Sequence, residues 1–328
     1  MSNICLVTGA NGHLGNNLVR TLLSKGETVL AGVRNTEMHE PFQGLDCKLV
    51  YTEMTDQDAM LTALHGVNVL YHVAAVFKHW AKNPETDIVQ KNIQGTETVL
   101  RAAALTGVKK VIYVSSVAAV GHNGQALNEQ HWNAESDNAY YRSKIMSERR
   151  AWELAEELNL NMVSVLPSAM IGPNAENLTD TMSFLESIRR KELPFDPNFI
   201  FNFVDVRDVA EGMFQAYKKG IAGERYILAN SGASSLREIV DAVNKDNRSL
   251  SVPKKASRWM LHVIAWFAEI GAKFTGVPAA LIKSQIDLFY GVRQEYDISK
   301  ARTELAYEPR SPADALSDAL EYLDSRAA

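Results

Sequence analysis

The sequence of 328 residues contains only two cysteines, Cys5 and Cys47. Two cysteines cannot form the disulfide framework that holds small secreted domains together, and no cysteine–histidine cluster has the spacing of a zinc site. We therefore expect no metal centre, and we expect Cys5 to fill a buried strand.

Basic clusters and a leader segment are also missing. The longest basic run is Arg189-Arg190-Lys191, in a chain whose net charge is −5. This pattern gives no reason to expect nucleic acid as a partner. Because only Met1-Ser2-Asn3 precede the first apolar run, there is no room for a signal peptide, and we expect a cytoplasmic location.

The chain has no apolar run long enough to cross a membrane. Its longest apolar stretch, "WMLHVIAWFAEIGAKF" from Trp259 to Phe274, is interrupted by His262, Glu269 and Lys273. A span needs roughly 20 apolar residues. The apolar positions follow helical spacing, so we expect a helix packed on the body of the protein. A lid, a partner surface and a helix that touches a membrane are the alternatives.

The first half of the chain alternates short β-branched runs with helix-like segments. The runs lie at 4–7, 28–33, 48–51, 67–73, 110–115 and 162–166, and the helical segments at about 13–25, 56–64, 86–106 and 138–159. This alternation predicts an α/β fold of the Rossmann type, a doubly wound parallel sheet with helices on both faces. "VIYVSS" and "MVSVLP" are typical of its buried central strands.

The first strand runs into "VTGANGHLG", in which Gly9, Gly12 and Gly15 are three residues apart. One glycine permits a tight turn, a second lets a pyrophosphate approach the backbone, and a third lets the following helix pack on the sheet. The phosphates would meet the positive end of that helix. A glycine-rich turn without a ligand is the alternative. The position between strand and helix favours dinucleotide binding.

The residues at the end of the second strand indicate which dinucleotide binds. NAD enzymes usually keep an acid there for the ribose hydroxyls. This chain has Gly32-Val33-Arg34-Asn35 and no acid. Arg34 suits an anionic 2′-phosphate, which favours NADP(H) over NAD(H). The alternative is that Arg34 is an ordinary surface residue.

A change of pattern near residue 174 predicts two domains. Beyond about residue 174 the rhythm loosens, and Pro194, Pro197 and Pro253 separate shorter elements. We predict an NAD(P)-binding domain over residues 1–173, to which 201–229 return. A smaller, interleaved substrate-binding domain takes most of 174–328.

Three residues have the chemistry of carbonyl reduction. Tyr140 and Lys144 are four apart at the start of a predicted helix and so share one face. A nearby ammonium favours the phenolate, so Tyr140 can pass a proton to a carbonyl oxygen or remove one from an alcohol. Ser116, just past a central strand, can hold that oxygen. Tyr141 and Ser115 are one residue out of register, and His72 is expected to be a buried structural histidine.

These motifs, in this order, resemble the extended short-chain dehydrogenase/reductase family, nearest its dihydroflavonol-4-reductase-like and 3β-hydroxysteroid dehydrogenase-like branch. The resemblance covers nearly the whole chain. It rests on Thr8-Gly9-x-x-Gly12-x-x-Gly15, His72-Val73-Ala74-Ala75, Asn92-x-x-Gly95-Thr96, Ser115-Ser116, Tyr140-x-x-x-Lys144 and Phe203-Val204-Asp205-Val206-Arg207-Asp208.

The resemblance implies the roles of further residues. It implies a catalytic set of Ser116, Tyr140 and Lys144, with Asn92 ordering the site. It implies cofactor contacts from Thr8, Gly9, Asn11, Gly12, His13, Leu14, Gly15, Arg34, Glu53, Met54, Ala74, Ala75, Tyr140, Lys144, Pro167 and Ser168. Glu53 stands where the family usually has Asp. For Ala74 and Ala75, close packing is an equal alternative. The family also often dimerises through helices like those at 86–106 and 138–159, so a homodimer is expected.

The same set of residues serves several reactions in the family, so substrate-facing positions must decide. Val117-Ala118 follow Ser116 where dehydratases carry Asp-Glu, and Phe201 stands where nucleotide-sugar epimerases commonly carry Arg. Val120-Gly121-His122 lacks the polar specificity residue of flavonoid reductases. We expect an NADPH-dependent reductase of a ketone or aldehyde in an apolar pocket. The predicted walls are Phe77, Trp80, Met170, Phe199 and Phe201.

Two other functions stay open on the sequence alone. A sugar or nucleotide-sugar epimerase of the same superfamily would use the same tyrosine and lysine. A non-catalytic NADP-binding regulator would keep the fold, but such proteins typically lose the tyrosine or the lysine, and this chain has both.

Overall fold

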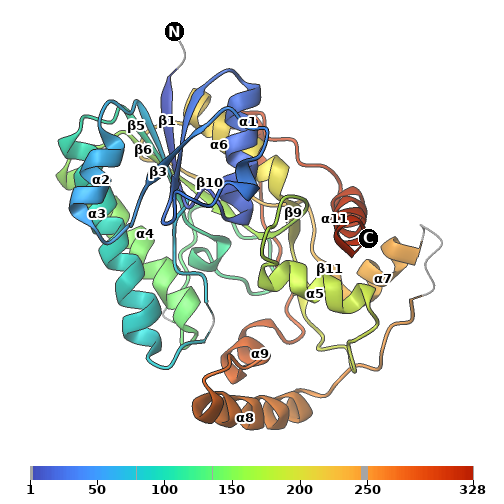
Figure 1. Cartoon of the computed structure of the whole chain (residues 1–328). Helices are drawn as coiled ribbons and strands as arrows, with labels where there is room; N and C mark the ends of the chain where they lie inside the picture. Colours follow the sequence, from blue (N-terminus) through green and yellow to red (C-terminus); the bar gives the residue numbers. More distant parts are fainter. Residues whose placement is uncertain (1–2, 79, 135, 245–249, 328) are drawn as a thin grey trace.

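A seven-stranded parallel sheet forms the centre of the protein, described by a computed structural model over residues 3–78, 80–134, 136–244 and 250–327 (Figure 1). The strand order is β10-β6-β5-β4-β1-β2-β3. The strands are β1 (Ile4–Thr8), β2 (Thr28–Val33), β3 (Lys48–Tyr51), β4 (Val69–His72), β5 (Lys110–Val114), β6 (Met162–Pro167) and β10 (Arg225–Leu228). The order reverses between β1 and β4, so the sheet is doubly wound, as predicted. Ligands bind such sheets at the carboxyl edge of this reversal.

Helices cover both faces of the sheet, and each face has its own core. One face carries α1 (His13–Ser24), α6 (Val206–Lys219) and α10 (Ser299–Leu305), and the other α2 (Gln57–Leu64), α3 (Lys91–Leu105) and α4 (Ala139–Glu157). A π-helical turn (Glu85–Gln90) leads into α3. Successive residues of β1 point to opposite cores: Cys5 and Val7 belong to one and Leu6 to the other. Both sides of each central strand are thus buried, which explains the continuous apolar runs.

Segments from the second half of the chain complete this body. β10 pairs in parallel with β6 and forms the edge of the sheet. Residues 298–307, which fall in the stretch predicted to be mostly substrate-binding, pack on the same core through Ile298, Ala301, Leu305 and Tyr307. The spacing of these apolar residues in sequence does not reveal which distant helix they will cover.

A smaller layer lies beyond the carboxyl edge of the sheet. β7 (Ala169–Ile171) pairs with β9 (Phe203–Asp205), and β8 (Ile200–Phe201) pairs with β11 (Ser234–Ser235). Helices α5 (Asp180–Arg189), α7 (Leu236–Asn244) and α11 (Pro312–Ala327) surround a separate apolar core with them. Helices α8 (Arg258–Thr275) and α9 (Lys283–Phe289) lie farthest from the main sheet (Figure 1).

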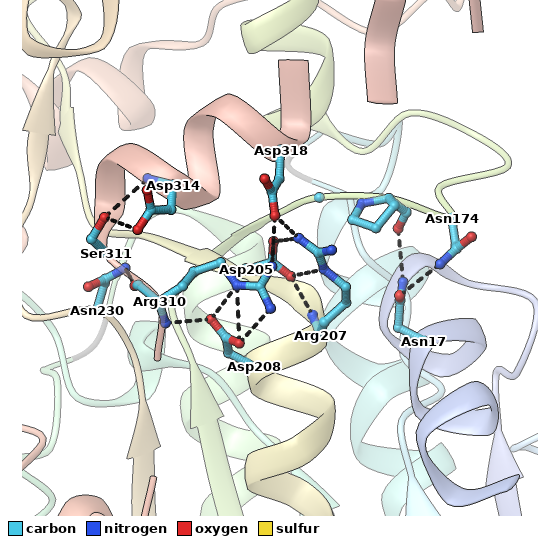
Figure 2. A network of polar contacts seen from close by, with 12 residues as sticks. Asn17, Asn174, Asp205, Arg207, Asp208, Asn230, Arg310, Ser311, Asp314 and Asp318 are labelled. Carbon is cyan, nitrogen blue, oxygen red and sulfur yellow. Dashed lines mark hydrogen bonds and ion pairs between the residues drawn. The ribbon is translucent and has the colours of Figure 1, made fainter. Parts of the chain in front are cut away.

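An ion-pair network joins the two layers (Figure 2). Asp205 is fully buried at the start of α6 and accepts hydrogen bonds from the backbone and side chain of Arg207. Arg310 lies between Asp208 of α6, at 3.0 Å, and Asp318 of α11, at 2.8 Å. The network therefore fixes α11 against α6, and with it the smaller layer against the main sheet.

The predicted helix over 259–274 is present as α8, but its expected packing on the body is largely wrong. Of its 18 residues only Leu261, Ala265 and Ala272 are buried. Trp259 is 76% exposed and Phe274 is 88% exposed. The neighbouring α9 has seven residues and is too short to cover a helix of this length. Every helix in the described ranges is too short or too polar to cross a bilayer.

The contact between Gly15 and the first turn predicts a stability effect. A Cβ on Gly15 would lie 2.2 Å from the Gly9 carbonyl oxygen, whereas a Cβ on Gly271 of α8 would meet nothing within 4 Å. Gly15→Ala should therefore lower the free energy of unfolding by roughly 1–3 kcal/mol, the usual effect of overpacking. Gly271→Ala should be neutral or stabilising by up to about 1 kcal/mol. Urea unfolding followed by circular dichroism measures both. Equal stabilities of the two variants would contradict the packing described here.

Candidate active site

The glycine turn lies at the carboxyl end of β1, where the strand order reverses. Gly9 has φ +65°, and a Cβ there would lie 3.1 Å from Cα of Ala74. The N–H of Gly12 donates to the Gly9 carbonyl at 3.0 Å and closes the turn. Ala74 thus acts by close packing beside Gly9, while Ala75 is exposed. The turn is tight because the residues on both sides of it are small.

The N-terminus of α1 fits a dinucleotide pyrophosphate. Gly12 precedes the helix and offers no side-chain cap, and no acidic residue stands in the first turn. The backbone N–H groups in the first turn of α1 are therefore left for an anion. The exposed Gly12 also presents no Cβ to an approaching phosphate, and Leu14 is buried behind it.

His13 anchors this helix to the second half of the chain. Its Nε2 lies 3.1 Å from the carbonyl oxygens of both Gly172 and Pro173 and so must carry the proton. Its Nδ1 is buried and has no partner among the described residues. Burial lowers the pKa of His13, so the ring is neutral at pH 7.

Thr8 and His72 hold the ends of β1 and β4 together. The Thr8 hydroxyl accepts from the N–H groups of Val73 and Ala74, at 3.0 and 3.1 Å, and its own proton is directed to Nδ1 of His72 at 3.0 Å. Burial, assisted by the Lys144 charge, lowers the pKa of His72 to about 3. His72 is therefore a neutral structural residue, as expected from the sequence. The N–H of Ala74 is used within the protein and is not free for a cofactor.

The residues predicted to meet the adenosine lie past β2 and β3. Arg34 is exposed just after β2 and makes no hydrogen bond or ion pair with any described residue. Glu53 accepts from the backbone and hydroxyl of Thr55, at 3.3 and 3.1 Å, so its carboxylate is held in place. Met54 packs its side chain against Gly95 of α3.

Two other predicted contacts are used partly within the protein. The N–H of Ser168, after Pro167 at the end of β6, donates to the Leu228 carbonyl at 3.3 Å, and the Ser168 hydroxyl lies 2.9 Å from Oδ1 of Asn202. Neither donor of Ser168 is left for a cofactor. The side-chain amide of Asn11 lies 3.8 Å from the Met38 sulfur, at the rim of the turn.

The start of α4 positions the predicted proton donor. The Asn138 side chain caps the helix and accepts from the N–H groups of Tyr140 and Tyr141, at 3.1 and 3.2 Å. Burial raises the pKa of Tyr140 to about 12; a hydrogen bond from Ser116 opposes the rise and the Asp180 charge adds to it. The phenol therefore carries its proton at neutral pH. Ser116 itself is fixed by the Ala118 N–H, at 3.1 Å.

Lys144 lies one turn further along the same face of α4. Its Nζ donates to the Val114 carbonyl at 3.4 Å, at the end of β5. Burial lowers the pKa of Lys144 to about 8, and the Glu148 carboxylate opposes this. The pKa of Tyr140 is raised overall and not lowered, as the neighbouring Lys144 led the sequence analysis to expect, because the burial of the phenol outweighs the stabilisation of its anion.

Asn92 fixes the loop after β4 against α4. Its Oδ1 accepts from the Val76 N–H at 2.7 Å, and its Nδ2 donates to the Val76 carbonyl and to the Ser143 hydroxyl, at 3.1 and 3.2 Å. Behind it is a cavity of about 10 Å³, room for about one water molecule. The cavity is lined by His72, Ala74, Ala75, Asn92, Thr96, Tyr113, Val114, Lys144 and Ser147.

The sequence analysis missed a buried ion pair beneath the site. Glu148, one turn beyond Lys144, is fully buried and forms a two-pronged pair with Arg225 of β10, at 2.9 and 3.1 Å. Ser115 and Ser164 donate to the same carboxylate at 2.6 and 2.9 Å. Ser115 is thereby excluded as the substrate-binding hydroxyl. The sequence did hold a signal for Glu148, because it lies four residues after Lys144, as Lys144 does after Tyr140, and so shares their helical face.

Aromatic rings form the wall next to Tyr140. The Phe77 ring packs edge-on against Tyr140, with ring centres 4.9 Å apart. Phe289 of α9, which the sequence analysis also missed, lies 5.2 Å from Phe201 and 5.6 Å from Phe199.

Tyr141 adds to this wall, whereas Met170 does not. Tyr141 packs against Phe289 and His122, so its ring belongs to this wall. Met170 packs against the main core instead, and Trp80 is partly buried. In the described residues no group of three or more His, Cys, Asp or Glu could hold a metal.

Comparisons with known proteins show what the whole chain is similar to. The model of the NAD dependent epimerase/dehydratase family matches residues 5–229. A protein of Synechocystis sp. named "Putative dihydroflavonol 4-reductase" is 32% identical, over 99% of this chain and 96% of its own length. "Sterol demethylase protein B" of Methylococcus capsulatus is 30% identical over 98% of each chain. The crystal structure of gox2253 is 30% identical, with a TM-score of 0.84 over 99% of both chains.

The buried Glu148–Arg225 pair predicts a large stability effect. Arg225→Met leaves a fully buried carboxylate without its counter-charge and should lower the free energy of unfolding by about 3–5 kcal/mol. Arg258→Met removes a pair with Asp287 whose side chains are about half exposed, and should cost about 1 kcal/mol or less. Urea unfolding curves of both variants test this. A loss below about 1 kcal/mol in Arg225→Met would show that the pair does not hold α4.

Proposed function

The chain belongs to the NAD dependent epimerase/dehydratase family, and from this premise we propose that it is an NADPH-dependent reductase of a ketone or aldehyde. The relatives similar over nearly its full length include a named reductase, and the chain is an oxidoreductase with a nicotinamide cofactor. The observation that carries the finer proposal is the buried phenol of Tyr140, hydrogen-bonded to Ser116 and one helical turn from Lys144.

The side chains around Tyr140 support a reduction. A bound reduced nicotinamide supplies the hydride. Ser116 holds the carbonyl oxygen by a hydrogen bond, and Tyr140 donates its proton to that oxygen as the negative charge develops. The donation leaves a phenolate one helical turn from the Lys144 ammonium, which stabilises it. Phe77 packs on the Tyr140 ring and limits access of water to the phenol.

The exposed Arg34 supports NADPH over NADH. It follows β2 directly, in a stretch without an acid, and it has no partner among the described side chains. A guanidinium in this place suits the 2′-phosphate that only NADPH carries.

The aromatic wall supports a bulky, apolar carbonyl substrate. Phe201 stands where the resemblance places an Arg in nucleotide-sugar epimerases, and the rings of Phe199 and Phe289 pack against it. The names of both full-length relatives, with "dihydroflavonol" and "sterol", also refer to polycyclic molecules. The epimerase alternative and the regulator alternative are less well supported, because the wall beside Tyr140 is aromatic and because Tyr140 and Lys144 are both kept.

Removal of the Tyr140 hydroxyl tests the proposed proton donor. Tyr140→Phe should lower the turnover of an accepted ketone by roughly 10²–10⁴-fold, the usual contribution of a general acid. NADPH affinity, followed by fluorescence, should change little. Tyr141→Phe is the matched control, since its ring belongs to the aromatic wall. Near-normal turnover in Tyr140→Phe, or a collapse confined to Tyr141→Phe, would refute the assignment.

Cofactor choice gives a second test. Arg34→Ala should weaken NADPH binding roughly tenfold to a hundredfold, which is the range of a charge-assisted hydrogen bond to phosphate. NADH binding should be unchanged and serves as the internal control in calorimetry. If both cofactors lose affinity equally, Arg34 does not discriminate between them.

The pKa values predict a pH profile for reduction. Lys144, whose pKa burial lowers to about 8, is charged below that pH and neutral above it. Tyr140, with a pKa of about 12, keeps its proton throughout. The rate constant kcat/KM should therefore be level at pH 6–7 and fall as the pH rises through about 8. Circular dichroism at each pH separates this fall from unfolding. A profile that stays level up to pH 10 would contradict the role of the ammonium.

A further inference from the structure

Helix α8 carries an apolar face that the rest of the described chain does not cover. Of the 13 large hydrophobic residues that are most exposed, six lie at or just after this helix: Trp259, Val263, Trp266, Phe267, Phe274 and Val277. The five that fall within α8 lie within about a third of its circumference, given 100° per residue. The three buried residues, Leu261, Ala265 and Ala272, lie on the opposite side. The helix therefore has two apolar faces, and only the face with Leu261, Ala265 and Ala272 packs against the rest of the described chain.

The segment that carries this face is basic in an acidic protein. Residues 251–290 contain five Lys or Arg and two Asp or Glu, while the whole chain has a net charge of −5. Both acids are engaged: Asp287 pairs with Arg258 at 2.7 Å, and Glu269 accepts from the backbone N–H of Lys283 at 2.7 Å.

The remaining lysines of the segment are available to an outside partner. Lys254, Lys255 and Lys273 are exposed and have no ion pair within the described ranges. Together with the engaged acids, they leave the segment with uncompensated positive charge.

We propose that α8 docks this face, in the plane of the interface, on an anionic lipid bilayer. Exposed Trp and Phe on one face, with lysines in the same segment, are the composition of helices that lie at the membrane interface without crossing it. The free lysines complement anionic headgroups. A second copy of the chain fits less well, because a two-fold contact would bring two basic segments together.

The docked face would lie close to the aromatic wall of the active site. Ile286 of α9 packs in one cluster with Leu261 and Ala265 of α8. Three residues further along α9, Phe289 contacts Phe201 and Tyr141. Docking would therefore hold the pocket wall near the lipid. The docking itself does not depend on the reductase activity and is tested separately from it.

Vesicle flotation with the full chain tests the proposal. We expect the protein to float with vesicles containing about 30% phosphatidylglycerol and much less with pure phosphatidylcholine. Raising NaCl from about 0.05 to about 0.5 M should reduce the bound fraction several-fold. No binding to the anionic vesicles, or binding independent of lipid charge and salt, would overturn the proposal.

Matched variants locate the contact. Trp259→Glu with Phe274→Glu changes two residues that are 76% and 88% exposed, and should lower the partition coefficient at least tenfold. Leu105→Glu with Ile221→Glu, at 70% and 55% exposure on other elements, should leave it unchanged. Thermal unfolding confirms that both variants fold. Equal binding by both, or a dimer in light scattering that only the α8 variant dissociates, would assign the face to something other than lipid.

Discussion

The candidate active site depends on the interactions of one buried carboxylate, that of Glu148. It lies on α4, and it joins that helix to the end of β5 through Ser115, to β6 through Ser164 and to β10 through Arg225. A carboxylate without partners in such a place would be very costly, so the three strands must supply partners for it. The same helix carries Tyr140 and Lys144. The position of the Tyr140 phenol, our proposed proton donor, is thus set by a buried ion pair one helical turn beyond Lys144.

Around this fixed helix, the two halves of the chain contribute different functions. The first half supplies the glycine turn, the uncapped end of α1 and the exposed Arg34, all of which suit a phosphorylated dinucleotide. The second half returns through β8 and α9 and adds Phe201 and Phe289 above Tyr140. The fold and the tyrosine–lysine pair are shared across a family with several reactions, so they do not choose among them. The aromatic wall offers apolar contact, and it is the feature on which our proposal of a carbonyl substrate rests.

The sequence predicted what depends on local periodicity and backbone sterics. The parallel strands, the helices between them and the turn at Gly9 follow from patterns a few residues long. Features that depend on distant partners were not predictable in the same way. Glu148 was overlooked because its counter-charge lies on β10, and Phe289 because α9 is placed by contacts with α8.

The pKa values also depend on distant parts of the chain that the sequence does not place. Adjacent lysine and tyrosine on one helical face predicted a lowered phenol pKa, but enclosure by other parts of the chain raised it. The exposure of α8 was likewise invisible in its helical spacing, since spacing does not state what covers a face.

Deuterium transfer tests the central claim, that this site reduces a carbonyl, most directly. NADPH deuterated at both C4 positions is incubated with the enzyme and a bulky apolar ketone accepted in an NADPH-oxidation screen, and the product is analysed by mass spectrometry and NMR. The account predicts an alcohol with one deuterium on the former carbonyl carbon. It is contradicted if no ketone or aldehyde gains the label while a nucleotide sugar is epimerised by the same preparation.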